Sequence, residues 1–270
     1  MDIVGLMRIF WQSFLDEAIS APYLARLSAY LSQIAAPGVT VDVRGLSPPV
    51  RDFGRLSEFR CATHAISSGI DAEREGYDGF VLGHFQDPGL YELRSALAIP
   101  VIGVGESTLF AAAQLGRRLG LVTLDPTFEV WHYEQADRYG LGGRIAHVKG
   151  LSFVPQDFNA AFDGDVEARA RLLRRFAECA EPMVASGADV IVPAGVLPGM
   201  LVASERSYRI GHAPVVNCAS VALKSAEMWM QIHALDGIEP SRGPSFALAP
   251  ERAKADFQAM LAPTKPTAPR

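Results

Sequence analysis

Short apolar runs alternate with longer amphipathic stretches along almost the whole chain, and this alternation constrains the fold more than any other feature. The runs are rich in Val and Ile, and several end in Gly or Pro, which is typical of buried parallel strands. They lie at 3–11, 39–45, 80–83, 101–105, 119–124, 145–150, 190–195 and 215–218. Helical patterns lie between them at 15–35, 62–76, 106–118, 128–139, 165–186 and 219–235. The alternation predicts an α/β fold with parallel sheets and right-handed crossovers.

Two segments of the chain resemble each other and suggest two similar halves. GYDGFVLGHF (76–85) and GADVIVPAGV (187–196) share a Gly-x-Asp entry, a four-residue apolar strand and a small residue at the exit. We therefore expect two doubly wound domains with mostly parallel four-stranded sheets, related by a pseudo-twofold axis, and an active cleft between the carboxyl ends of their strands. The expected boundaries are 1–105 plus 214–262 for the first domain, 106–213 for the second, and 263–270 for a disordered tail.

Composition excludes several classes of protein. A net charge of −5, with no dense cluster of Lys and Arg beyond one helical face, argues against nucleic-acid binding. No run approaches the roughly 20 apolar residues of a membrane span. The three cysteines are too few and too scattered for a disulfide framework or a CxxC metal site, and they fit a reducing cytoplasm. We expect a cytoplasmic homo-oligomer with a small-molecule substrate, and the apolar helix at 227–235 is a candidate interface.

Residues at the predicted strand ends are the candidates for a site, because ligands of open α/β sheets bind beyond the carboxyl ends of the strands. His84 stands where an apolar strand runs out into a turn, and an imidazole can act as acid or base near neutral pH. A hydrogen-bonded structural histidine is the alternative interpretation. The candidate substrate-binding residues are Trp11, Gln12, Ser13, Phe85, Ser107, Thr108, Thr123, Gly195 and Val196.

The segment GVGEST (103–108) has two interpretations that remain open. It is either an ordinary helix start or a cradle in which free N–H groups and the hydroxyls of Ser107 and Thr108 bind a carboxylate or imide. Walker, GxGxxG, HExxH and GxSxG motifs are lacking from the sequence. We therefore expect no metal, no cofactor and no serine-hydrolase chemistry.

Taken together, these segments resemble the aspartate/glutamate/hydantoin racemase superfamily, and most closely its hydantoin racemase branch. The FxDPGL turn followed by IPVIGVGE is the most specific part, whereas the first 70 residues match in outline only, with WQS (11–13) in place of the family's usual Asn-Pro-Asn. The resemblance is carried by GYDGFVLGHFQDPGLYELRSALAIPVIGVGES (76–107), LGRRLGLVTL (115–124), YGLGGRIAHVKG (139–150), GADVIVPAG (187–195) and APVVNCASVALKSAEM (213–228).

The resemblance implies a specific mechanism and a departure from it. In the family, two cysteines, one from each domain, work on opposite faces of the substrate Cα: one thiolate removes the proton and the other thiol delivers one. Here both cysteines are replaced, because His84 stands at the first position and Gly195 at the second. Cys218, at the end of the eighth predicted strand, is the nearest remaining cysteine.

The sequence therefore predicts a cofactor-independent enzyme with racemase-like proton-transfer chemistry on a small amino-acid derivative, a hydantoin, carboxylate or imide. We expect His84 to act as the general base and Cys218 or a tyrosine as the second proton carrier. Two alternatives remain open. One is a lyase (decarboxylase) or hydrolase that uses His84 as its single acid or base. The other is a non-catalytic ligand-binding protein that keeps the cradle of Ser107, Thr108 and Thr123.

Overall fold

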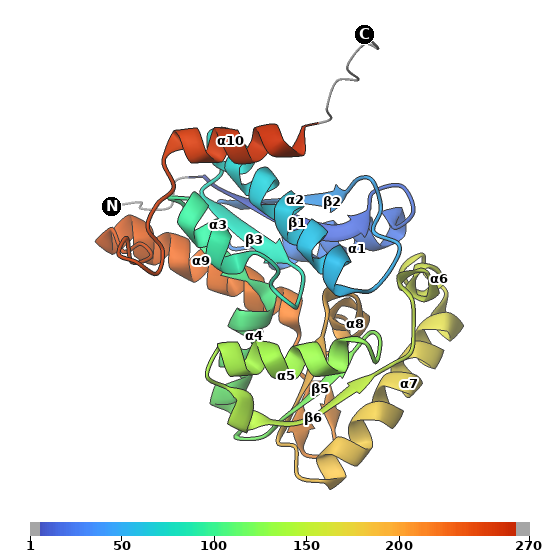
Figure 1. Cartoon of the computed structure of the whole chain (residues 1–270). Helices are drawn as coiled ribbons and strands as arrows, with labels where there is room; N and C mark the ends of the chain where they lie inside the picture. The colour runs from blue at the N-terminus through green and yellow to red at the C-terminus, as the bar shows by residue number, and fades with distance from the viewer. Residues whose placement is uncertain (1–5, 263–270) are drawn as a thin grey trace.

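The first of two parallel sheets is built from the N-terminal part of the chain. The computed structural model describes residues 6–262. The strands β1 (Met7–Asp16), β2 (Val39–Leu46), β3 (Gly79–Gly83) and β4 (Val101–Gly103) are all parallel and lie in the order β2-β1-β3-β4. In Figure 1 this sheet forms the upper part of the molecule. It is the four-stranded sheet that the apolar runs predict.

The second parallel sheet has three strands in the described chain, where the sequence predicts four. The strands β5 (Leu119–Thr123), β6 (Ile145–Gly150) and β7 (Val190–Ala194) lie in the order β6-β5-β7. The fourth run makes only one parallel bridge, Ile191 with Val215. Pro193 has no N–H to continue the ladder on that side, so the pairing stops. The α/β fold with two parallel sheets is confirmed, and the strand count of the second sheet is corrected.

Ten α-helices within residues 6–262 connect and cover the strands. The pattern at 15–35 predicts a helix that in fact begins later, because β1 continues to Asp16. Helix α2 begins at Arg55, seven residues before the predicted start at 62. The helices are α1 (Ala21–Ile34), α2 (Arg55–Arg74), α3 (Leu90–Ala96), α4 (Val104–Leu115), α5 (Phe128–Arg138), α6 (Asn159–Phe162), α7 (Val166–Ala185), α8 (Val196–Val202), α9 (Cys218–Asp236) and α10 (Glu251–Leu261).

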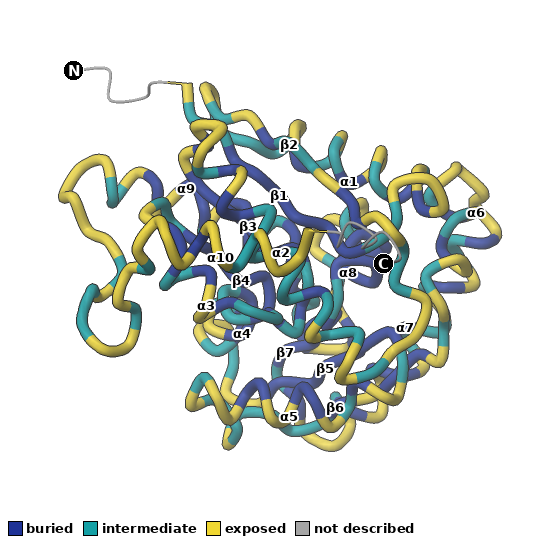
Figure 2. Tube along the Cα trace, turned by 45° about the horizontal axis from the view of Figure 1, so that its top comes forward, coloured by how far each residue is buried: buried dark blue, intermediate teal, exposed yellow. Residues whose placement is uncertain are grey.

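Buried residues follow the strands of both sheets, as Figure 2 shows for β1, β3, β5 and β7. Every residue of β3, β5 and β7 is buried, since helices cover both faces of these central strands. Their apolar runs are therefore continuous rather than alternating. The polar residues that function requires can lie only where these strands end.

The chain returns to the first sheet after the second is complete. On α9, the buried carboxylate of Glu227 accepts a hydrogen bond from the backbone N–H of Ala36, at 2.8 Å. On α10, Lys254 is only 5% exposed and its Nζ lies 3.1 Å from the Glu73 carboxylate of α2. The domain boundaries at 105/106 and 213/214 stay a prediction. The tail at 263–270 lies outside the described residues.

Between residues 6 and 262 we find no helix that is both long enough and apolar enough to cross a bilayer.

Candidate active site

A small pocket lies where the carboxyl ends of the two sheets face each other. Its volume is about 120 Å³. Sequence-predicted residues from both halves of the chain line it together. They are Ser13, His84 and Phe85 from the first half, and Thr123, Gly195 and Val196 from the second.

His84 pairs with a carboxylate that the sequence analysis missed. Its Nε2 lies 3.2 Å from Oε1 of Glu58, in the first turn of α2, and both side chains are less than one-fifth exposed. The ring of Phe14 packs edge-on against the imidazole, with the ring centroids 5.0 Å apart. Cys61, one helical turn after Glu58, also lines the pocket beside His84. The helical spacing of 58 and 61 places both on one face of α2.

The Glu58 carboxylate sets the charge state of His84. Burial alone lowers the pKa of His84, but the negative charge of Glu58 and the hydrogen bonds with Cys61 and Glu58 outweigh it and raise the pKa well above its ordinary value. Burial raises the pKa of Glu58, yet the imidazolium brings the net shift of that pKa downward. The backbone N–H of Gln86 points to Nδ1 from 3.4 Å, which suits a neutral ring but is long for a hydrogen bond. The ion pair is the stronger influence, so His84 rests as an imidazolium.

A buried chain of hydrogen bonds lies behind the part of the pocket wall that Thr123 contributes. Thr123 Oγ1, at the end of β5, lies 3.0 Å from Nε2 of His132 on α5. His132 Nδ1 lies 3.1 Å from Oε1 of Gln135, one turn further along the helix. The amide nitrogen of Gln135 donates to the carbonyl oxygen of Phe85 and thereby joins this chain to the residue after His84. Burial lowers the pKa of His132 to about 4, so its imidazole is neutral.

Asp87, in the turn after His84, is a structural residue. Its fully buried carboxylate accepts hydrogen bonds from the backbone N–H groups of Gly105 (3.0 Å) and Glu106 (2.6 Å) and from the Tyr139 hydroxyl (2.7 Å). It therefore caps the first turn of α4. Burial raises the pKa of Asp87 to about 7 against these donors.

The hydroxyls of Ser107 and Thr108 lie outside this pocket. Ser107 Oγ donates to the carbonyl oxygen of Gly103 at 2.7 Å, and Thr108 Oγ1 donates to that of Val104 at 2.6 Å. Hydroxyls within a helix commonly bond to the carbonyl one turn back. Of the three hydroxyls in the predicted cradle, that of Thr123 belongs to a residue lining the pocket. The hydroxyls of Ser107 and Thr108 instead make hydrogen bonds within the first turns of α4.

Three further predicted residues lie within or behind the first sheet. Trp11 is fully buried in the core, and Gln12 Nε2 donates to the carbonyl oxygens of Ser13 (2.8 Å) and Gly45 (3.0 Å). Neither residue lines the pocket, because β1 continues through these positions instead of ending there. Ser13 does line it, and its buried Oγ has no hydrogen-bond partner among the described residues.

Cys218 lies behind the pocket wall. It is fully buried at the start of α9, and its thiol donates to the carbonyl oxygen of Gly195 at 3.4 Å. Burial raises the pKa of Cys218 to about 12. The thiol thus stays protonated at neutral pH, and Gly195 stands between it and the pocket.

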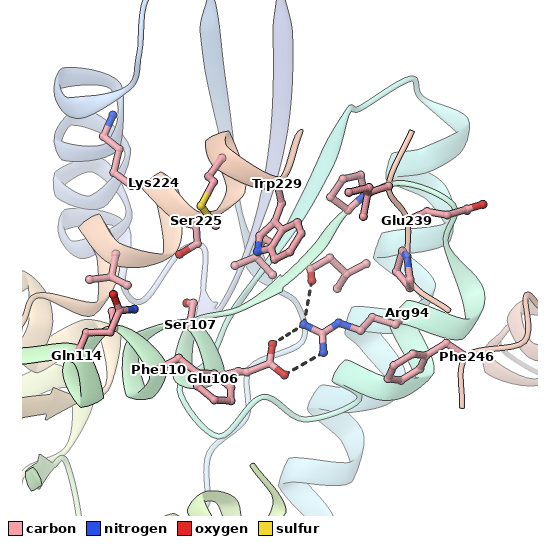
Figure 3. A pocket seen from close by; sticks show the side chains of 18 residues that line it. Arg94, Glu106, Ser107, Phe110, Gln114, Lys224, Ser225, Trp229, Glu239 and Phe246 are labelled. Atoms are coloured by element: carbon pink, nitrogen blue, oxygen red, sulfur yellow. Dashed lines mark hydrogen bonds and ion pairs between the residues drawn. The ribbon is translucent and has the colours of Figure 1, made fainter. Parts of the chain in front are cut away.

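A larger cavity of about 790 Å³ lies elsewhere, between α3, α4 and α9 (Figure 3). Its walls are mostly apolar, with Phe110, Trp229 and Phe246 among them. At its floor Arg94 Nη1 lies 2.9 Å from Oε1 of Glu106, so the two charges neutralise each other. The homo-oligomer expected from the apolar helix at 227–235 stays a prediction. We find no cluster of metal-binding side chains within residues 6–262.

Comparison with known proteins agrees with this architecture. The sequence model of the family described as Asp/Glu/Hydantoin racemase matches residues 20–226. A hydantoin racemase of Pseudomonas sp. (strain NS671) is 32% identical over 103 residues, which cover 38% of this chain and only 40% of that protein. One of Paenarthrobacter aurescens is 26% identical over 222 residues, 82% of this chain and 89% of that protein. The structure of an allantoin racemase from Klebsiella pneumoniae superposes with a TM-score of 0.72 at 23% identity, covering 90% of this chain and 94% of that one.

Proposed function

The chain belongs to the Asp/Glu/hydantoin racemase family, and on this premise we propose that it is a cofactor-independent isomerase. Its reaction inverts a carbon next to a carbonyl group in a small amino-acid derivative, a hydantoin or a related carboxylate or imide. The relatives named hydantoin racemase and allantoin racemase support a cyclic imide as the first substrate to test. The small volume of the pocket supports a small ring rather than a large substrate.

The observation that carries this proposal is the His84–Glu58 pair inside the pocket. The resemblance places His84 where the family has its first catalytic cysteine. An imidazole held by a carboxylate can give a proton to a carbanion and take one back near neutral pH. The buried hydroxyl of Ser13, which lies near that of Tyr23 but makes no close hydrogen bond within the described residues, can orient a substrate oxygen or nitrogen in the pocket.

The test is proton exchange at the substrate carbon. Each enantiomer of a 5-substituted hydantoin is incubated with the protein in D₂O, and NMR and optical rotation follow deuterium incorporation and inversion. The wild-type protein should exceed the spontaneous rate by a wide margin, His84→Ala should lose this advantage, and His212→Ala, a histidine outside the pocket, should keep it. Full activity in His84→Ala would overturn the role of His84. Exchange no faster than without protein, for hydantoins and for free amino acids, would overturn the function.

A lyase is the second candidate, and the residue at position 195 favours it. Gly195 stands where the resemblance places the second cysteine, so that wall has no thiol, and apolar side chains follow it at Val196, Leu197 and Pro198. Loss of CO₂ from a malonate needs only one proton donor, and an apolar wall disfavours a carboxylate. Release of CO₂ from a disubstituted malonate, without exchange in hydantoins, would favour the lyase. Ring opening in the same NMR experiment would indicate a hydrolase, and binding without exchange a ligand-binding protein.

A further inference from the structure

We propose that Thr123 is the second proton carrier of this site, and that His132 exchanges a proton with it from behind. This inference rests on the proposed racemisation and names the group that works on the face of the substrate opposite His84. Thr123 lines the pocket from the second sheet, whereas His84 lines it from the first. His132 is fully buried and acts only through Thr123, so it is a positioning residue.

The hydrogen bonds around Gln135 fix the tautomer of His132. Gln135 Nε2 donates to the carbonyl oxygen of Phe85 and lies 3.2 Å from the Asp87 carboxylate, so this end of the amide is the nitrogen. The other end, Oε1, faces His132 Nδ1 and accepts a hydrogen bond from its N–H group. The neutral ring therefore carries its proton on Nδ1, and Nε2 is an unprotonated acceptor.

Within residues 6–262, the hydrogen that His132 Nε2 can accept is that of the Thr123 hydroxyl. The same hydroxyl lies 3.2 Å from the carbonyl oxygen of Ala194, a second acceptor, but Nε2 is nearer at 3.0 Å. A hydroxyl that donates to a basic nitrogen behind it presents its oxygen lone pairs forward. Thr123 is thus arranged to accept a proton from the pocket side while it gives its own to His132.

The transfer balances as a single exchange between two imidazoles. The Cα–H proton of one enantiomer passes to Thr123 Oγ1 as the Thr123 proton passes to His132 Nε2, and the C–H electron pair moves into the adjacent carbonyl. The His84 imidazolium then gives a proton to the opposite face of Cα. His84 ends neutral and His132 ends as the imidazolium, so the total charge is unchanged. Because the pKa of His132 is low and that of His84 is high, His132 then returns its proton through Thr123 to water and His84 takes one from water, which restores the starting state. The other enantiomer runs the same steps in reverse.

Among the described lining residues from the second half of the chain, Thr123 carries the side-chain proton. Cys218 is separated from the pocket by Gly195 and donates to its carbonyl oxygen. The remaining lining residues from the second half of the chain, such as Val196 and Pro198, carry no side-chain proton to transfer.

The experiment measures exchange from each enantiomer of a 5-substituted hydantoin separately, in D₂O. Thr123→Val keeps the shape of the side chain but removes the hydroxyl. We expect it to slow exchange of one enantiomer by about 100-fold or more while the other still exchanges through His84, which also shows that the variant is folded. Thr123→Ser should restore the lost exchange. His132→Gln, which keeps an acceptor near Nε2 without a titrating group, should slow the same enantiomer with KM unchanged.

The outcomes separate the two proposals. Equal loss for both enantiomers in Thr123→Val, or no loss for either, overturns the role of Thr123 while leaving the racemase proposal in place. Wild-type activity in His132→Gln overturns the role of His132. Lack of exchange in the wild-type protein overturns the proposed function, and the proton transfer through Thr123 with it.

Discussion

His84 Nε2 lies 3.2 Å from Glu58 Oε1, and this contact joins the loop after β3 to the first turn of α2. A carboxylate in the first turn of a helix is stabilised there by the helix dipole, independently of its partner. Glu58 therefore remains charged beside His84 and holds it as an imidazolium. The acid of the proposed reaction depends on a residue that is 26 positions away in the sequence.

Removing the Glu58 charge should lower the pKa of His84. In Glu58→Gln, no carboxylate charge outweighs the burial of the imidazole, so the pKa of His84 falls and the ring becomes neutral at a lower pH than in the wild type. NMR titration of the His84 ring should show this decrease, and the pH profile of kcat/KM should shift to lower pH with it. Glu134→Gln, which removes a carboxylate from the exposed pair with Arg55, should leave both unchanged. An unaltered His84 pKa in Glu58→Gln would contradict the ion pair.

Asp87 should make folding less favourable as the pH rises. Its pKa is about 7 in the folded protein, against an ordinary value of 3.8, so the folded state binds more protons between these values. The free energy of unfolding should therefore fall from pH 4 to pH 7, by up to about 4 kcal/mol from this group. Asp87→Asn cannot titrate, so its stability relative to wild type should rise over that interval in urea unfolding. Asp189→Asn, which also removes a carboxylate that accepts from backbone N–H groups, is the control. A constant difference between wild type and Asp87→Asn would refute this prediction.

Cys218 should be dispensable for proton transfer. Its thiol does not line the pocket, and burial keeps it protonated with a pKa of about 12. Cys218→Ala should keep the exchange rates of both enantiomers close to wild type, at a cost of about 1 kcal/mol in the free energy of unfolding. Cys179→Ala, at another buried cysteine, gives the comparison for the stability effect. If Cys218→Ala slowed exchange of one enantiomer only, the Cys218 thiol would have to be a proton carrier and this prediction would be wrong.

A thiol introduced at position 195 should take over the proton transfer that we assign to the Thr123 hydroxyl. Thr123 Oγ1 lies 3.2 Å from the carbonyl oxygen of Ala194, the residue before Gly195. A side chain introduced at position 195 would therefore begin close to the Thr123 hydroxyl. A Cβ there would lie 3.2 Å from Cγ and Cδ of Pro198 and would have to tolerate a φ of +159°, so any side chain at this position carries the same backbone strain. Thr123→Val combined with Gly195→Cys should recover exchange of the lost enantiomer, increasingly as the pH approaches the ordinary thiol pKa near ~8.5. Gly195→Ser in the same background should not recover it. Equal recovery by both would show that size, not ionisation, matters.

Periodicity predicted the fold well because the central strands are covered by helices on both faces. The continuous apolar runs at 80–83, 119–124 and 190–195 each became a fully buried strand within one residue of the expected ends. The run at 215–218 failed as a strand because Pro193 on its neighbour cannot donate to it. The apolar composition of the run at 215–218 does not indicate which strand lies beside it or whether that strand can donate hydrogen bonds.

The site was predictable where it depends on strand ends and unpredictable where it depends on helix packing. His84 and Thr123 follow or end a buried strand, so the sequence indicates them directly. Glu58 reaches the pocket, and His132 reaches Thr123, only because α2 and α5 pack against these particular strand ends. In the sequence, Ser107 and Thr108 look free at a helix start, but carbonyl oxygens of the same helix or its cap already accept hydrogen bonds from their hydroxyls.

The carboxylate of Asp87 makes opening of the site visible to hydrogen exchange. Its Oδ1 accepts from the amide of Gly105, and its Oδ2 accepts from the amide of Glu106 and from Gln135 and Tyr139 of the α5 region. The turn after His84 therefore cannot move away without releasing the first turn of α4, and the two segments open as one cooperative unit. The amide protons of Gly105 and Glu106 thus serve as reporters of how often the pocket loses its geometry in the native state.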